Sequence, residues 1–93
     1  MLYRNKKLLE LCRELPCQCC GRQDGTVVAA HRNEGKAMGS KVSDALVASL
    51  CHVCHHELDN GKTLTKDERR DMWNRAYIGT MKEFIEREWL KIA

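Results

Sequence analysis

Two Cys-x-x-Cys pairs constrain this sequence more than any other feature. Cys17 and Cys20 form the first pair, and Cys51 and Cys54 form the second, much farther along the chain. The short spacing lets both thiolates of a pair face one ion from a tight turn, and two pairs complete the tetrahedral site of structural zinc. We therefore expect one structural Zn²⁺ ion, held by these four cysteines.

The small size of the chain makes such a cross-link necessary. With 93 residues, of which 5% are aromatic, it has room for one domain with a small hydrophobic core. Residues 1–7 lack the apolar region of a signal peptide, and the longest apolar stretch, residues 45–50, is far shorter than the ~20 residues of a membrane span. We expect a cytoplasmic protein with reduced thiols and no membrane partner.

Three alternatives to the zinc site remain open in the sequence. The four cysteines could be unligated core residues, or Cys19 could replace Cys20, although Gly21 favours a turn directly after Cys20. Residues 51–55 also match the C-x-x-C-H signature of haem attachment. That attachment belongs to exported proteins, and a second cysteine pair is present here, so no haem is expected. Cys12 is expected to pack in the core.

Hydrophobic periodicity predicts an α+β order of helix, cysteine pair, strand, loop, strand, short helix and long helix. The expected strands cover residues 26–31 and 45–50, with a loop at 32–43. The expected helices cover residues 5–15, 52–60 and about 65–92, the last opened by the capping box Thr65-Lys-Asp-Glu68. Residues 1–93 would form a single domain with its zinc-bound core at about 17–61.

Two histidines and an acid accompany the predicted zinc site. His31 ends the first predicted strand, while His55 and Asp59 share one face of the short helix. An imidazole and a carboxylate so placed can bind a divalent ion, and a free imidazole can take a proton from an attacking water. A lone histidine is more often a surface or hydrogen-bonded residue, and His52 and His56 are expected to be solvated.

This order of features resembles the HNH endonucleases, whose ββα-metal unit is often pinned by two Cys-x-x-Cys pairs. Residues 17–80 look more narrowly like the small phage and prophage proteins of the YbcO type, which are described as nucleases. The similarity lies in Ala30-His31-Arg-Asn, in residues 35–41 and in residues 50–61. The resemblance implies His31 as general base, with His55 and Asp59 as ligands of a catalytic Mg²⁺ or another divalent ion.

Two positions depart from the HNH pattern. Asp44 falls where the family has its middle Asn, which braces the hairpin loop, and a carboxylate accepts hydrogen bonds but cannot donate them as an amide does. Ala30 stands where many of these enzymes have a metal ligand. The catalytic ion would then depend on His55, Asp59, water and substrate phosphate, which implies weak binding without nucleic acid.

The positive charge and the resemblance together predict that the partner is DNA, which can include branched recombination intermediates. The net charge is +3, and Arg32, Lys36 and Lys41 lie in or beside the loop between the strands, where they can contact phosphates without reading sequence. The sequence thus favours an HNH-type endonuclease of phage or prophage DNA metabolism.

Two other classes of function remain open. One is a non-catalytic, zinc-dependent nucleic-acid-binding module, and the other is a protein-interaction adaptor that uses the apolar C-terminal helix. In that helix Trp73, Tyr77 and Trp89 can fill the core or dock a partner, and the shortage of other large apolar residues favours the core.

Overall fold

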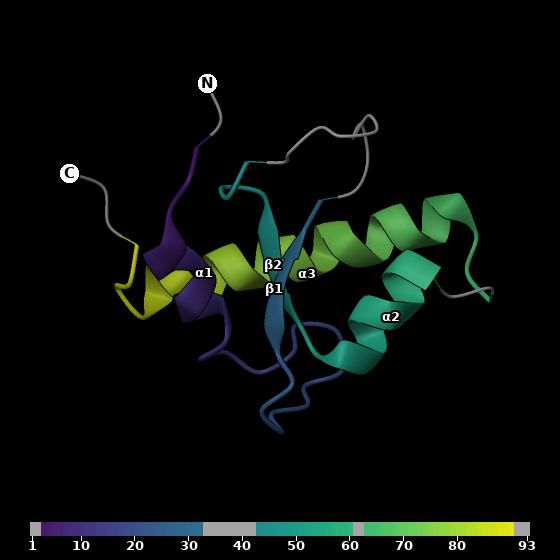
Figure 1. The fold of residues 1–93 in the computed structure, drawn as a ribbon, viewed down its shortest axis with the longest axis horizontal. Coiled ribbons are helices and arrows are strands. Elements are labelled where there is room, and N and C mark those ends of the chain that lie inside the picture. The colour runs from purple at the N-terminus through teal and green to yellow at the C-terminus, as the bar shows by residue number, and fades with distance from the viewer. Residues whose placement is uncertain (1–2, 33–42, 61–62, 91–93) are drawn as a thin grey trace.

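The computed structural model describes residues 3–32, 43–60 and 63–90. They form a small α+β fold with helix α1 (Lys6–Cys12), strands β1 (Val28–His31) and β2 (Val47–Leu50), and helices α2 (His52–Asn60) and α3 (Lys66–Glu86) (Figure 1). Within these ranges, no helix has both the length and the apolar character that crossing a membrane requires. The predicted α+β class and the order of elements are confirmed.

The two strands form an antiparallel hairpin that α3 crosses (Figure 1). Val28 pairs with Leu50 at one end and His31 pairs with Val47 at the other. The cysteine pairs adjoin the Val28–Leu50 end, so His31 lies at the opposite end of the hairpin. All of β2 is buried: Ala48 and Leu50 belong to one hydrophobic cluster, Val47 belongs to another, and Ser49 is a buried polar residue.

Both strands begin later than predicted, because turns occupy the residues before them. The Thr26 N–H donates to the side chain of Asp24 over 3.1 Å, which closes a turn before β1. The Leu46 N–H donates to the Ser43 carbonyl over 3.1 Å, which closes a turn before β2.

Helix α3 supplies much of the core. Its capping box is confirmed: the Thr65 hydroxyl accepts from the Glu68 N–H at 3.1 Å, and the Glu68 carboxylate accepts from the Thr65 N–H at 2.8 Å. Trp73 is buried, donates its indole N–H to the Ala30 carbonyl at 3.0 Å, and stacks on Tyr77 with ring centroids 5.0 Å apart. The core role expected is confirmed for Trp73, and Tyr77 packs against the same core while partly buried. The same expectation is wrong for Trp89, whose side chain is 37% exposed.

A buried polar link joins α1, β2 and α3. The Ser49 N–H donates to the Thr80 hydroxyl oxygen over 2.9 Å, and the Ser49 hydroxyl donates to the Cys12 carbonyl over 2.8 Å. The Thr80 hydroxyl in turn donates to the Ala76 carbonyl over 2.7 Å. The buried hydroxyls of Ser49 and Thr80 therefore both have hydrogen-bond partners, as burial requires.

Helix α1 is shorter than predicted. It begins after Asn5, whose side chain accepts a hydrogen bond from the Leu8 N–H at 3.1 Å, and it ends at Cys12 instead of Leu15. The following residues bond three positions back, with the Leu15 N–H donating to the Cys12 carbonyl, so the last turn tightens. This tighter turn carries Leu15 into the core before Pro16.

Helix α3 ends at Glu86, and the prediction that it continues to about residue 92 is wrong. The Trp89 N–H donates to the Phe84 carbonyl at 2.9 Å, and the Glu88 N–H donates to the Ile85 carbonyl at 3.1 Å. Together with a φ of 60° at Glu88, these bonds form a Schellman motif. Trp89 accordingly folds back on Phe84, with ring centroids 6.1 Å apart.

Replacing Glu88 by glycine should stabilise the protein. A left-handed conformation costs a residue with a Cβ atom free energy that glycine does not lose, so Glu88→Gly should raise the free energy of unfolding by about 0.5–1 kcal/mol. Urea denaturation of the zinc-loaded protein measures this change. The matched control is Asn74→Gly, on the exposed face of α3, which should lower the same quantity by about 0.3–0.5 kcal/mol; equal destabilisation by both variants would contradict the assignment.

Candidate metal centre and histidine pairs

The first cysteine pair lies in a turn between α1 and β1. The Gly21 N–H donates to the Cys17 carbonyl at 2.9 Å, the Cys17 N–H donates to the Arg22 carbonyl at 2.8 Å, and Gly21 has a φ of 81°. The Gln18 N–H then donates to the Ser49 carbonyl at 2.9 Å, which fastens the turn to β2. Gly79 of α3 faces the Gln18 side chain, and a Cβ atom there would lie 2.7 Å from the Gln18 amide oxygen, so that amide would have to shift.

The four predicted zinc ligands converge on one point. Cys51 follows β2 directly, Cys54 lies in the first turn of α2, and the sulfur atoms of Cys17, Cys20, Cys51 and Cys54 all lie within 4.8 Å of one another. We call this group the thiol cluster. The Cys20 and Cys51 sulfurs are 3.7 Å apart. This distance matches the edge of a zinc–thiolate tetrahedron, about 3.8 Å for bonds of about 2.3 Å, and it is far longer than a disulfide bond of about 2.05 Å. The thiol cluster can therefore hold a zinc ion.

The surroundings give the thiols of the cluster different proton affinities. Burial acts to raise the pKa of Cys17, but hydrogen bonds from the backbone of Cys20, Cys51 and Cys19 outweigh it and lower that pKa to about 7. Burial and hydrogen bonds with the other three thiols raise the pKa of Cys54. A backbone hydrogen bond from Arg22 acts to lower the pKa of Cys20, yet burial and the contacts with Cys51 and Cys17 raise it overall. A cation entering the thiol cluster must therefore displace protons.

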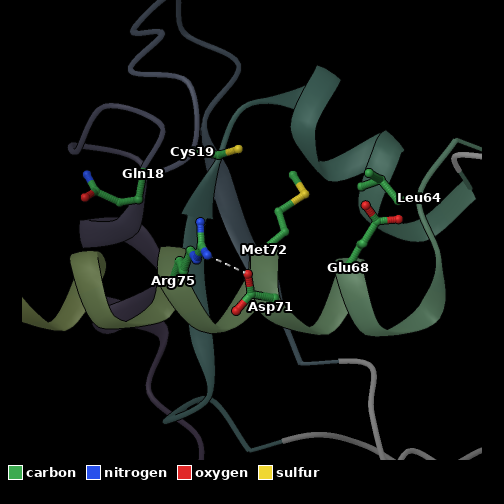
Figure 2. A pocket seen from close by; sticks show the side chains of 7 residues that line it. All are labelled: Gln18, Cys19, Leu64, Glu68, Asp71, Met72 and Arg75. Carbon is green, nitrogen blue, oxygen red and sulfur yellow. Dashed lines mark ion pairs between the residues drawn. The ribbon is translucent and has the colours of Figure 1, made fainter.

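The structure separates Cys20 from the alternative ligand Cys19. Cys20 belongs to the thiol cluster, whereas the exposed Cys19 points toward a surface pocket beside α3, near Met72 and the ion pair of Asp71 with Arg75 (Figure 2). Cys12 is buried as expected, and burial raises its pKa to about 11 despite a hydrogen bond with Ser49. The Cys12 thiol therefore stays protonated near neutral pH and is a poor nucleophile.

His31 and Asp44 form a hydrogen-bonded pair at the end of the hairpin. His31 Nε2 lies 2.8 Å from Asp44 Oδ1, and the side chains are 33% and 5% exposed, respectively. The hydrogen bond with His31, followed by that from the Asn5 backbone, lowers the pKa of Asp44. Because an ionised carboxylate only accepts, Nε2 of a neutral His31 carries the hydrogen and Nδ1 keeps its lone pair. Asp44 thus holds the imidazole of His31, beyond the loop-bracing role that the resemblance implied.

No sequence pattern indicated the N-terminal partners of Asp44. The Asn5 N–H donates to Oδ2 at 2.8 Å, Arg4 Nη1 lies 3.2 Å from Oδ1, and the Asp44 N–H donates to the Tyr3 carbonyl at 2.9 Å. These residues precede α1 and lie far from Asp44 in the sequence, and no periodic pattern connects them. The segment from Tyr3 to Asn5, which we call the N-terminal segment, therefore secures the carboxylate that holds His31.

His55 and Asp59 face each other on α2 as predicted. His55 Nε2 lies 3.0 Å from Asp59 Oδ2, and each side chain is 34% exposed. Among the described residues, the thiol cluster is the group of three or more His, Cys, Asp or Glu side chains that could hold a metal ion. Ala30 is buried and its carbonyl accepts the Trp73 indole N–H, so its position adds no ligand side chain. Among the described residues, the candidate ligands of a catalytic ion are therefore the two side chains of His55 and Asp59.

The predicted phosphate-contacting residues are described only in part. Arg32 continues the hairpin beyond β1, because its N–H donates to the Leu46 carbonyl at 3.1 Å. Lys36 and Lys41 lie outside the described residues. Comparisons with protein-family models, with curated proteins and with solved structures found no match. The chemistry of the residues therefore carries the functional argument.

The thiol cluster should bind one zinc ion per chain, and Cys20 should be required where Cys19 is not. Cys20→Ser removes a sulfur of the cluster and should abolish stoichiometric zinc, whereas Cys19→Ser should keep one zinc per chain. Native mass spectrometry and elemental analysis measure the zinc content. Chelation should unfold the protein, because the binding energy of structural zinc, about 10–16 kcal/mol, rivals the stability of a whole domain; a fold unchanged by chelation would contradict this.

Zinc affinity should rise steeply with pH. Because the pKa values of Cys20 and Cys54 are raised, both thiols are protonated near neutrality and each must release a proton to bind the ion. These two groups should increase the apparent affinity about 100-fold per pH unit between about pH 6 and 8. Cys17, with a pKa of about 7, adds dependence only below that pH. Competition against a chelator measures the slope, and a flat profile would exclude proton displacement.

Proposed function

We propose that this chain is a metal-dependent endonuclease of the HNH type that hydrolyses DNA phosphodiester bonds, with His31 as its general base. The observation that supports this proposal best is the partly exposed His31 imidazole held by the buried carboxylate of Asp44. Two further features support it: the order β1, β2, α2, and the thiol cluster at the opposite end of the hairpin. The resemblance in sequence suggests phage or prophage DNA metabolism in a bacterial cytoplasm as the setting.

In the proposed reaction, His31 activates a water molecule. Nδ1 takes a proton from the water while its oxygen bonds to phosphorus, and the bond to the leaving sugar oxygen breaks. The leaving oxygen then takes up a proton from solvent. Asp44, ionised because its pKa is lowered by His31 and Asn5, stabilises the imidazolium that forms on His31.

His55 and Asp59 are the residues that would hold the catalytic Mg²⁺ or another divalent ion. An imidazole and a carboxylate on one helix face fit such an ion, although their own 3.0 Å contact must open to admit it. When bound, the ion would neutralise negative charge on the scissile phosphate. With Ala30 in place of a third ligand, water and substrate phosphate would complete the coordination, so we expect tight binding only with DNA present.

A non-catalytic, zinc-dependent DNA-binding module is the second candidate. The buried Ala30, in a position where a ligand side chain is expected, specifically favours it. Such a module would keep the hairpin and the thiol cluster and would bind DNA without cutting it.

Replacing His31 by alanine separates the two candidates. General-base catalysis contributes about 10²–10⁴ in rate, so His31→Ala should reduce nicking of supercoiled plasmid with Mg²⁺ or Mn²⁺ by about 100-fold or more. His56→Ala, at an exposed histidine of α2, is the matched control and should nick at the wild-type rate. Each variant should retain one zinc ion.

Two results would count against this proposal. Equal nicking by the wild type and His31→Ala would exclude His31 as the base. DNA binding by the wild type with no nicking under any divalent ion would favour the non-catalytic module.

A further inference from the structure

The N-terminal segment places a cation beside the candidate base. Arg4 Nη1 and His31 Nε2 contact the same atom, Asp44 Oδ1, at 3.2 Å and 2.8 Å. Arg4 Nη1 and His31 Nε2 are therefore no farther apart than the sum of these two distances to Oδ1. The nitrogen that takes the proton, Nδ1, lies across the same ring from Nε2. A guanidinium this close to the imidazole can therefore reach a phosphodiester whose attacking water Nδ1 activates.

We propose that Arg4 is a phosphate-binding residue that receives a non-bridging oxygen of the DNA phosphodiester on which His31 acts. The proposal rests on the endonuclease function proposed above and adds a residue to its site. An arginine side chain has five N–H donors in a planar fork, a geometry that suits phosphate oxygens. A surface ligand can reach Arg4, because its side chain is 46% exposed.

The environment of Arg4 differs from that of an ordinary surface ion pair. Its partner Asp44 is 5% exposed and is also held by the Asn5 N–H, so one end of the contact is fixed in the fold. The pair of Arg22 with Asp24 provides the contrast: the side chains are 44% and 42% exposed, at 3.7 Å, near the thiol cluster. An exposed ion pair of that kind contributes little to folding stability and does not hold its arginine in one position.

A fixed cation would also compensate for the small ligand set of the candidate metal site. His55 and Asp59 leave an ion with two protein ligands, and Ala30 adds none. Phosphodiester hydrolysis develops negative charge on the phosphate oxygens, and preorganised donors at those oxygens stabilise it. Arg4 would supply such a donor to the phosphodiester at His31, from a segment outside the hairpin and α2.

The test uses Arg4→Gln, Arg4→Lys and the matched control Arg22→Gln, each checked for zinc content and folded structure. Glutamine can still hydrogen-bond to Asp44 but has no charge, whereas lysine keeps the charge. Fluorescence anisotropy of a labelled DNA duplex, without added divalent ion, gives affinity between about 50 and 200 mM salt. Arg4→Gln should lower the slope of log affinity against log salt by about 1, while Arg4→Lys and Arg22→Gln should retain the wild-type slope.

Plasmid nicking is the second measurement. Arg4→Gln should reduce kcat by about 100-fold, as loss of one preorganised donor does, and Arg4→Lys should recover part of that loss. A wild-type slope and wild-type nicking in Arg4→Gln would overturn the role of Arg4 while the endonuclease stands. An Arg4-dependent slope with no nicking by the wild type would support the phosphate contact and overturn the endonuclease. Absence of DNA binding by the wild type at 50 mM salt would overturn the phosphate contact.

Discussion

The convergence of four sulfur atoms is the constraint on which the rest of this structure depends. The thiol cluster gathers the turn before β1, the residue after β2 and the first turn of α2 at a single point. The apolar contacts of so small a core contribute little stability, and a bound ion would add much more at this point. With zinc in the thiol cluster, the base of the hairpin and the start of α2 become one rigid unit, and the direction of α2 follows from it.

The two ends of the hairpin are secured by different chemistry. At the base, soft thiols suit a metal ion, while at the other end a buried carboxylate accepts hydrogen bonds from His31, Asn5 and Arg4. The first arrangement confers stability, and the second leaves an imidazole partly open to solvent. This division allows the exposed end to serve chemistry without weakening the anchored end.

Local patterns predicted what depends on local physics. Cysteine spacing identified the thiol cluster, and the Thr65–Glu68 capping box identified the start of α3, because each signal lies within one turn of chain. The end of α3 was missed, since the apolar spacing continues to Trp89 although that ring folds back on Phe84. The contact of Arg4 with Asp44 was missed for a different reason: it joins segments that meet only after the hairpin and α1 have packed.

The hydroxyl of Thr80 has a consequence for helix register. Ala76, Thr80 and Phe84 repeat every four residues along α3, so a slip of the helix by four residues, about 6 Å, would place Ala76 or Phe84 where Thr80 now lies. Such a slip would bring a methyl group or a phenyl ring opposite the backbone N–H of Ser49, which would then be buried without an acceptor. The Thr80 hydroxyl oxygen thus favours one register of α3 against β2 over others that would bury similar apolar surface.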